Sequence, residues 1–365
     1  MIDDAAAVQL LRRLCEIPSV SGDESAAVAF MVEQATRAGL RASVDGAGNF
    51  VATAGDGDRV IVLLGHIDTV PGAVPARVDA GIIHGRGAVD AKGPLAAFLV
   101  AVSRVTIPAG TRVVVIGAVE EEAPSSKGAH FVLDGYRPEV VIIGEPSGAA
   151  AITLGYKGRV SVRLRAAGPH AHSAAERRTV ASLAVAWWSE VERRCAAFNE
   201  EKRVFDRLDP HLAAFNTATD GFEDTVEVRG SVRLPVDYPI GDLERQLRHA
   251  AESWGTVDVH GVTPAFRTDT KNVLVRTFLQ SLREMDLEPR FTLKTGTSDM
   301  NVVGPVWRCP IVAYGPGDSS LDHAPNEHVR VDEYLTAVRV LTGVIERLGM
   351  SGRASALPRG AAGRG

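Results

Sequence analysis

The sequence has little of what holds extracellular scaffolds and membrane spans together. Only 3 of its 365 residues are cysteine (positions 15, 195 and 309), too far apart for a CxxC metal site or a paired disulfide framework. Stretches without charge, such as 93–103, are shorter than the ~20 residues of a membrane helix. Residues 1–4 are acidic where a signal peptide would be basic. We therefore expect a soluble, cytoplasmic protein without a membrane partner.

The chain also lacks a large charge of either sign and several well-known catalytic motifs. It has 40 Lys and Arg against 45 Asp and Glu, which excludes nucleic-acid binding driven by net charge. A P-loop is absent, and so is the Gly-x-Ser-x-Gly elbow of serine hydrolases. The glycine-rich segment from Gly85 could be a dinucleotide loop, but it places Asp90 where a carboxylate would repel a pyrophosphate. A nicotinamide oxidoreductase is therefore disfavoured.

What the sequence does contain is the alternating pattern of an α/β protein. Continuous apolar runs predict strands buried on both faces at 60–64, 113–119 and 140–143. Helical patterns occur twice before Gly39 and again at 94–105, 126–133, 271–284 and 332–348. This alternation is typical of a three-layer α/β/α domain around a largely parallel sheet.

The pattern changes in the middle of the chain. From Lys157, apolar and basic residues alternate, which predicts a strand with one solvated, basic face. The elements expected next are a helix, two strands, a helix and a strand, at about 176–196, 212–219, 224–236, 240–253 and 256–262. The order β-α-β-β-α-β is that of a ferredoxin-like α+β domain. We therefore predict a domain at 155–268 inserted into one formed by 1–154 and 269–350, with a disordered tail at 351–365.

Histidines and carboxylates follow the predicted buried strands or lie in glycine-rich loops. They are His66, Asp68, Asp90, Glu120, Glu121, Glu122, Glu145 and His323. Taken singly, each has a structural explanation, such as a core histidine, a helix N-cap or a solvated run of charge. Together they are expected at one edge of a sheet, where α/β proteins bind ligands. Two imidazoles and three carboxylates suit two divalent ions, and mixed nitrogen and oxygen ligation favours zinc, cobalt or manganese.

These residues, in this order, resemble the co-catalytic zinc aminoacylase/carboxypeptidase family, which includes acetylornithine deacetylase and succinyl-diaminopimelate desuccinylase. The resemblance covers about residues 10–348. It implies an amide hydrolase with a metallopeptidase-like catalytic domain, two divalent metal ions per chain (zinc or cobalt), and a homodimer joined through an inserted lid domain. The stretches 120–128, 155–158 and 296–301 are most similar to one branch of the family. That branch releases lysine, and in some members ornithine, from the C-terminal γ-glutamyl group of an acidic amino-group carrier protein, the last step of α-aminoadipate lysine biosynthesis.

The resemblance also implies roles for individual residues. The metal ligands would be His66, Asp90, Glu122, Glu145 and His323. Asp90 would bridge the two ions, Glu121 would be the general base, and Asp68 would orient His66. The run of three glutamates leaves a second register open, in which Glu120 and Glu121 are base and ligand. The distance from the ligand to Gly128 favours Glu121 and Glu122.

The inserted domain is expected to contact the substrate and a second subunit. His172 resembles the family histidine that reaches a neighbouring active site across a dimer. Residues at substrate-contacting positions of the family are Asn216, Arg233, Gly296, Thr297 and Ser298.

The inserted domain is also locally basic. Residues 155–195 carry eight Lys and Arg against three Glu, which makes this region a candidate docking face for an acidic carrier protein. The core of that face would be Lys157, Arg159, Arg163 and Arg165. An ordinary solvated sheet face is the alternative.

Two other functions remain possible on the sequence alone. The alternative within the family is a deacylase of small N-acyl amino acids, because the metal motifs do not separate the two substrate classes. A non-catalytic metal-binding protein would be expected to lack the base or a ligand, and both are present in this sequence.

Overall fold

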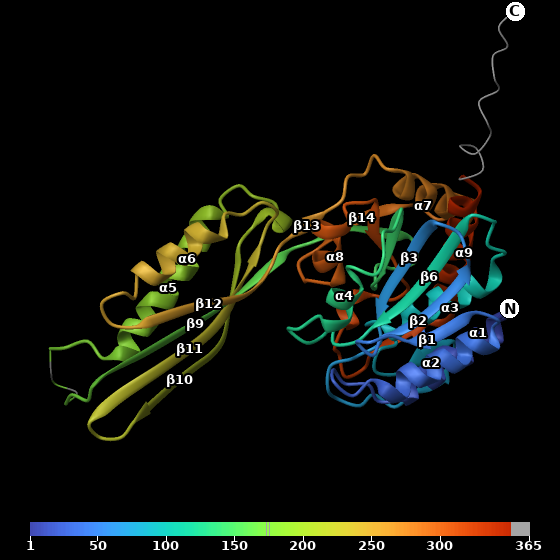
Figure 1. The fold of residues 1–365 in the computed structure, drawn as a ribbon. Coiled ribbons are helices and arrows are strands. Elements are labelled where there is room, and N and C mark those ends of the chain that lie inside the picture. The colour runs from blue at the N-terminus through green and yellow to red at the C-terminus, as the bar shows by residue number, and fades with distance from the viewer. Residues whose placement is uncertain (173, 175, 352–365) are drawn as a thin grey trace, which may run out of the picture. The chain divides into compact units, whose positions relative to one another are not determined.

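The computed structural model describes residues 1–172, 174 and 176–351, and it contains two compact units (Figure 1). Unit 1 comprises Met1–Gly155, Thr268–Thr292 and Ser298–Gly365, and unit 2 comprises Tyr156–Arg267 and Leu293–Thr297. Unit 2 therefore interrupts unit 1 in the sequence. Of the predicted disordered tail, Ser351 is the last residue of a helix and 352–365 lie outside the described residues.

Seven α-helices of the described chain belong to unit 1. They are α1 (Asp4–Glu16), α2 (Ser25–Arg37), α3 (Lys92–Arg104), α4 (Lys127–Val132), α7 (Val273–Glu284), α8 (Asp299–Trp307) and α9 (Val331–Ser351). Side chains cap the starts of α1, α7 and α8; for example, the Asp3 side chain accepts the N–H of Ala6 and the Asn272 side chain accepts that of Val275. The helix α8 was not predicted, and a one-turn 3-10 helix covers Ser319–Leu321.

The main sheet of unit 1 has a parallel centre and antiparallel margins. Its strands are β1 (Arg41–Val44), β2 (Phe50–Gly55), β3 (Arg59–His66), β6 (Thr111–Ala118), β7 (Val140–Gly144), β8 (Ala151–Tyr156) and β15 (Ile311–Ala313). They are arranged in the order β1-β2-β6-β3-β7-β15-β8, and β14 (Arg290–Lys294) also pairs with β8. Pairing is parallel from β6 to β15 and antiparallel for β1/β2, β2/β6 and β15/β8. The sheet was predicted to be largely parallel; its centre is parallel, and its margins are antiparallel.

The buried apolar runs form the central strands because both faces of the sheet are covered. Residues 60–64 of β3 and 113–116 of β6 are all buried. The helix α3 approaches the sheet closely over glycines. A Cβ on Gly117 would lie 2.8 Å from Leu95, and one on Gly144 would lie 2.8 Å from Phe98. The mixed α/β fold predicted from the sequence is confirmed.

A small second sheet in unit 1 connects the loops that carry Asp90 and His323. It has the order β16-β5-β4, with β4 (Arg77–Asp79), β5 (Ile82–His84) and β16 (His328–Arg330). The strand β5 leads into the loop that carries Asp90, and β16 follows the loop that carries His323. Pairing of β5 with β16 therefore holds the bases of both loops together.

Unit 2 is a four-stranded antiparallel sheet with two helices on one face (Figure 1). Its elements are β9 (Gly158–Pro169), α5 (Val180–Phe198), β10 (Asp209–Thr219), β11 (Glu223–Leu234), α6 (Ile240–His249) and β12 (Thr256–Thr263), with a short 3-10 helix (Val204–Asp206) and β13 (Phe266–Arg267). The sheet order β10-β11-β9-β12 is that of a ferredoxin-like fold. Alternate residues of β9, such as Val162 and Leu164, pack with Trp187 and Trp188 in its core.

One sequence prediction for unit 2 is wrong. Lys157 was expected on the solvated face of the strand, but it is fully buried and precedes the first residue of β9. Its ammonium forms an ion pair of 2.5 Å with Asp209 and donates to the backbone carbonyl of Val204 at 3.3 Å. These partners satisfy the buried charge. The apolar/basic alternation was therefore extended one residue too far.

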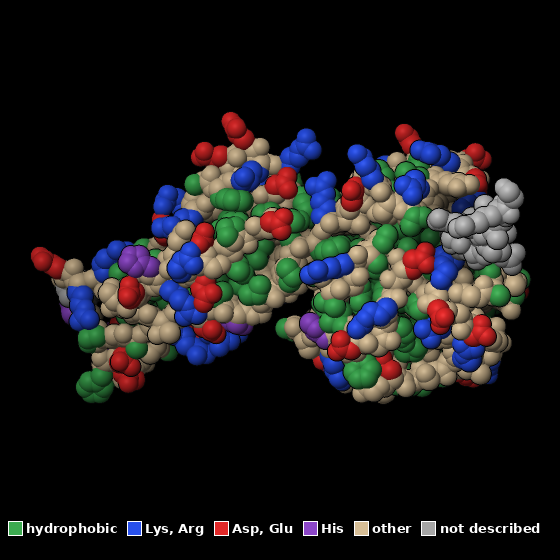
Figure 2. Space-filling model, turned by 45° about the horizontal axis from the view of Figure 1, so that its top comes forward, with side chains coloured by type: hydrophobic (Ala, Val, Ile, Leu, Met, Phe, Trp, Pro, Cys, Tyr) green, Lys and Arg blue, Asp and Glu red, His purple; other side chains and the backbone are tan. Residues whose placement is uncertain are grey.

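The surface carries both signs of charge. Figure 2 shows Lys and Arg side chains interspersed with Asp and Glu on the visible face of both units. None of the helices in the described segments combines the length and the apolar composition needed to cross a bilayer.

Candidate active site

The imidazole of His66 lies buried at the end of β3, between two aspartates. Its Nδ1 is 3.0 Å from the backbone carbonyl oxygen of Asp68 and 3.4 Å from that residue's Oδ1, and its Nε2 is 3.1 Å from Oδ1 of Asp90. A carbonyl oxygen only accepts hydrogen bonds, so Nδ1 carries the hydrogen in this arrangement. The lone pair of Nε2 is then directed at the carboxylate cluster, as in a metal-ligating histidine.

The three consecutive glutamates after β6 point in different directions. Glu120 has a left-handed backbone conformation (φ +58°), and its side chain accepts a hydrogen bond from Ser125 and pairs with Lys127. Glu121 places Oε2 4.0 Å from Nε2 of His66, and Glu122 places Oε1 2.9 Å from Nε2 of His323. Only the second and third glutamates therefore face the histidines, as expected in the Glu121/Glu122 register.

Asp90 lies between the two histidines and offers one oxygen to each. Its Oδ1 is 3.1 Å from His66 Nε2, and its Oδ2 is 3.0 Å from His323 Nε2. The ligand atoms of His66, Asp90 and Glu122 all lie within 4.8 Å of one another, and Oε1 of Glu145 is 3.9 Å from His66 Nε2. The structure thus brings the five predicted ligands and the predicted base into one cluster of unit 1.

The electrostatics of this cluster are those of crowded, buried negative charge. Burial, followed by Glu145 and Asp299, raises the pKa of Glu121 well above its usual value. Burial and Asp90 raise the pKa of Glu122 to about 7, and burial and Asp90 likewise raise that of Glu145. Carboxylates in such proximity repel one another unless protons or cations lie between them. The donor set of imidazole nitrogens and carboxylate oxygens fits divalent transition-metal ions.

The pKa values of the two histidines are raised as well, but for an imidazole this favours the charged form. Hydrogen bonding to Asp90 raises the pKa of His323 to about 9, although partial burial opposes it. Burial lowers the pKa of His66, but the hydrogen bonds with Asp68 and Asp90 outweigh it and raise that pKa well above its usual value. The same two histidines lower the pKa of Asp90 despite its burial. Asp90 and the two histidines therefore stabilise each other's charged forms.

Two further carboxylates lie near the site, and neither was among the predicted metal ligands, the base or the orienting aspartate. Glu327 is fully buried, accepts the N–H groups of Val89 and Asp90 through one oxygen, and pairs with Arg86 at 2.7 Å through the other. It therefore fixes the loop of the bridging candidate Asp90. In the described chain, both carboxylate oxygens of buried Asp299 lack a hydrogen-bond partner, and burial raises its pKa to about 7. Asp299 lies in the stretch 296–301, which the resemblance had singled out, whereas no sequence pattern marks Glu327.

The predicted site residues of unit 2 lie in several places within that unit. His172 is exposed, and its Nδ1 accepts the N–H of Ala174 at 3.1 Å. Arg233 donates to Oγ1 of Thr297 at 3.3 Å, which brings two of the predicted substrate contacts together. Gly296 is next to this pair in the chain, and Ser298 belongs to unit 1, where its side chain caps α8.

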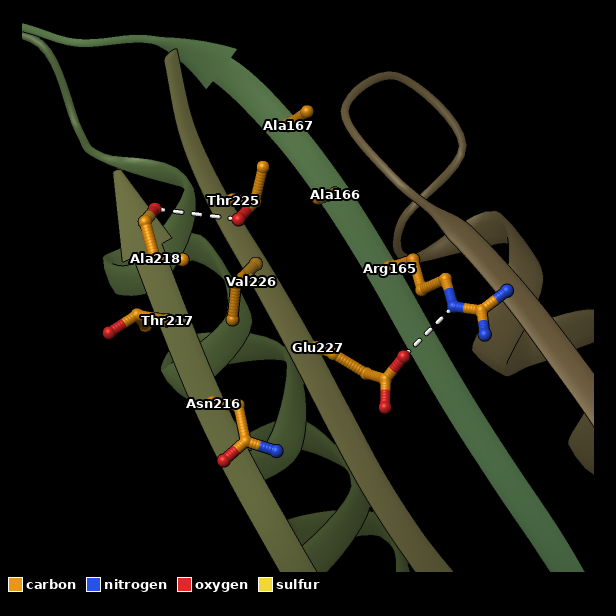
Figure 3. Close-up of a pocket in the computed structure, with 9 residues that line it drawn as sticks. All are labelled: Arg165, Ala166, Ala167, Asn216, Thr217, Ala218, Thr225, Val226 and Glu227. Atoms are coloured by element: carbon orange, nitrogen blue, oxygen red, sulfur yellow. Dashed lines mark hydrogen bonds and ion pairs between the residues drawn. The ribbon is translucent and has the colours of Figure 1, made fainter. Parts of the chain in front are cut away.

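Asn216 lies apart from that pair, on the face of the unit 2 sheet that the helices leave open. It contributes to a shallow hollow of about 530 Å³ over β9, β10 and β11 (Figure 3). The other residues that form the hollow are Arg165, Ala166, Ala167, Thr217, Ala218, Thr225, Val226 and Glu227.

The same open face carries arginines in an unfavourable arrangement. Arg159 is directly opposite Arg233, and Arg163 is directly opposite Arg229, in the register of β9 and β11. Like charges at opposed positions of a sheet are destabilising. Glu227 pairs with Arg165 at 3.0 Å and with Arg229 at 3.3 Å, and Asp258 of β12 is opposite Arg163. We call Arg159, Arg163, Arg165, Arg229 and Arg233 the arginine face.

Comparison with known proteins places the chain in a family. The model of peptidase family M20/M25/M40 matches residues 62–347, so the chain belongs to this family. It is a metal-dependent hydrolase that acts on amide bonds.

Similar proteins include a "[LysW]-lysine hydrolase" of Deinococcus radiodurans, 42% identical over 95% of this chain and 98% of that relative. A "putative [LysW]-lysine/[LysW]-ornithine hydrolase" of Thermococcus kodakarensis is 39% identical over 95% of this chain and 94% of its own length. Among solved structures, an M20 family metallo-carboxypeptidase of Sulfolobus solfataricus has a TM-score of 0.76 at 18% identity, covering 94% of this chain and 99% of its own.

Proposed function

We propose that this protein releases lysine, with ornithine as a second product, from the C-terminal γ-glutamyl group of an amino-group carrier protein. The observation that carries the proposal is the 42% identity with a relative named "[LysW]-lysine hydrolase", over 95% of this chain and 98% of that relative. Similarity over nearly the full length includes unit 2, where a carrier substrate would be recognised. Such a role belongs to amino-acid biosynthesis in the cytoplasm.

The proposed cofactor is a pair of divalent ions, zinc or cobalt, per chain. His66 and Glu145 would hold one ion, Glu122 and His323 the other, and Asp90 both. The orientation of Asp90, with one oxygen toward each histidine, supports this division. So does the raised pKa of Glu122 and Glu145, since buried carboxylates need a nearby cation to ionise. Divalent ions at such a site lower the pKa of water and polarise a carbonyl oxygen.

Within this site, Glu121 is the proposed general base. It would take a proton from the attacking water and return it to the leaving amine, which leaves as the free amino group of lysine. Its position supports the role, because its side chain lies beside His66, is only 13% exposed, and makes no ion pair with a lysine or arginine among the described residues. Asp68 would keep His66 in its tautomer.

Unit 2 is proposed as a lid and dimerisation domain. His172 is exposed and would stabilise the developing oxyanion in the active site of a second copy, so the proposal includes a homodimer. Arg233, Thr297 and their neighbours Gly296 and Ser298 would bind substrate carboxylates, and Asn216 would contact substrate on the open face. The arginine face would attract the acidic carrier.

Amino-acid release by the metal-loaded enzyme tests the proposal. The substrates are carrier-protein–lysine, carrier-protein–ornithine and N-acetylornithine, with Glu121→Gln as the control for background hydrolysis. We expect kcat/KM for the carrier substrates to exceed that for N-acetylornithine by more than ~100-fold. A preference for N-acetylornithine would overturn the carrier proposal and leave an amide hydrolase of small N-acyl amino acids.

A further inference from the structure

The four consecutive backbone N–H groups of residues 119–122, directly after β6, all donate to side-chain oxygens. The N–H of Val119 donates to Oδ1 of Asn49 at 3.0 Å, and that of Glu120 to Oε1 of Glu24 at 3.1 Å. The N–H groups of Glu121 and Glu122 donate to the two oxygens of Asp68, at 3.1 and 3.0 Å. The three acceptors are all buried and come from separate segments of the chain. Each backbone N–H of the turn that carries the candidate base and ligand therefore donates to a buried side chain.

Glu24 is unusual among these acceptors. It occupies the N-cap position of α2 but makes no side-chain hydrogen bond to that helix. Asp, Asn, Ser and Thr are the preferred residues at this position, because their shorter side chains reach the first turn. Instead, Oε1 of Glu24 accepts the N–H of Gly22 at 2.8 Å together with that of Glu120. A glutamate side chain is one methylene longer than that of aspartate. The carboxylate of Glu24 therefore reaches past its own helix to the turn formed by residues 119–122.

The contact falls where the turn changes direction. Glu120 has a φ of +58°, a left-handed backbone conformation that residues other than glycine rarely adopt. This conformation directs Glu120 toward Ser125 and Lys127, while Glu121 and Glu122 face the histidines. An acceptor for the Glu120 N–H therefore stabilises the one backbone conformation that separates the outward glutamate from the two inward ones.

We propose that Glu24 is a positioning residue that sets Glu121 and Glu122 in the active site by accepting the backbone N–H of Glu120. It acts through the backbone and does not touch the reacting atoms. The proposal rests on the roles given above to Glu121 and Glu122. Loss of a group that orients metal ligands typically reduces metal affinity or activity 10–100-fold.

The test compares three variants of Glu24 in the full-length enzyme. Glu24→Gln keeps an oxygen at the same reach without the charge, Glu24→Asp keeps the charge but shortens the reach, and Glu24→Ala removes both. Asn272→Ala is the matched control, because Asn272 also accepts a backbone N–H, at the start of α7. Zinc affinity is measured by competition with a chromogenic chelator. The values of kcat and KM are measured at saturating zinc with carrier-protein–lysine and with N-acetylornithine.

We expect Glu24→Gln to remain within about threefold of the wild type. Glu24→Asp and Glu24→Ala should lose ~10–100-fold in kcat or in zinc affinity, with KM changed less than threefold. Asn272→Ala should lower Tm but leave kcat, KM and zinc affinity unchanged. Wild-type kcat and zinc affinity in a folded Glu24→Asp would overturn the proposal, as would an equal loss in Glu24→Gln. Zinc affinity is measured without substrate, so it tests the role of Glu24 even if the carrier protein is not the substrate. An active Glu121→Gln variant would instead overturn the proposed role of Glu121 as the base.

Discussion

Two regions of this protein gather charge of one sign, and they differ in burial. The carboxylates of unit 1 are buried together, and burial raises the pKa of Glu121, Glu122 and Glu145. The arginine face of unit 2 concentrates positive charge where Arg159, Arg165 and Arg229 are exposed to water. Water solvates the exposed arginines freely but reaches the largely buried carboxylates much less. Burial therefore decides which counter-charge each region needs.

The counter-charges differ in size and range. The buried cluster suits small cations at bonding distance, because ligand atoms of His66, Asp90 and Glu122 lie within 4.8 Å of one another. The exposed face acts over about 8–10 Å, the distance at which salt screens charges at physiological strength. The field of the arginine face therefore acts on an acidic molecule before contact, whereas a single arginine binds a carboxylate only at contact.

The largest expected effect is a difference in kcat between variants of two neighbouring glutamates, Glu121 and Glu120. Glu121→Gln should reduce kcat by ~10²–10⁴-fold, the usual contribution of a general base. Glu120→Gln should change kcat less than threefold, because Glu120 faces Ser125 and Lys127. Steady-state kinetics of both zinc-loaded variants checks this. A larger loss of kcat in Glu120→Gln than in Glu121→Gln would favour the other register, in which Glu120 is the base and Glu121 the ligand.

A smaller effect, confined to one substrate class, is expected from the arginine face. The double variant Arg163→Glu/Arg229→Glu should raise KM for carrier-protein–lysine about 10-fold or more at low salt, and less at high salt, where screening weakens the attraction. Turnover of N-acetylornithine should not change. Arg193→Glu/Arg245→Glu is the matched control, since it reverses two exposed arginines on the helices of unit 2. Equal effects of both pairs would mean that only net charge matters.

The smallest effect is the pH dependence of stability in the metal-free protein. The folded-state pKa is about 7 for Glu122 and about 9 for His323, above the ordinary values of 4.5 and 6.5. Each group binds more protons in the folded state than in the unfolded state. The stability it contributes is therefore complete below its ordinary pKa and is lost as pH rises through its folded pKa.

Chelator-treated protein should consequently melt a few degrees lower at about pH 8.5 than at about pH 5.5. Zinc should raise Tm more at the higher pH, where it no longer competes with protons. Thermal melting with and without zinc, in the wild type and in Glu122→Gln, measures this. The variant should show a weaker pH dependence, and an unchanged one would assign the effect to other groups.

The sequence predicted the centre of the site because strong local patterns lead to it. The apolar runs of β3, β6 and β7 place the strands, so the residues that follow them, including His66 and Glu145, are brought to one edge of the sheet. The predicted roles of these residues await the experiments above.

The supporting residues could not be predicted in this way. Glu24, Asn49 and Glu327 act on backbone N–H groups far along the chain, and no periodicity records such pairs. Short strands such as β5 and β16 span three residues each, too few for an alternating pattern to be recognised. Lys157 shows the same limit, because alternation does not mark where β9 begins.

The interruption of unit 1 by unit 2 has a consequence for the order of events during synthesis. His66, Asp90, Glu122 and Glu145 leave the ribosome before any part of unit 2, whereas His323 and Glu327 follow it. Asp90 thus lacks one of its histidines and the buried carboxylate that anchors its loop until residues 323–327 have been synthesised. Completion of the proposed set of metal ligands would therefore be a late step, because a nascent chain that stops within unit 2 still lacks His323.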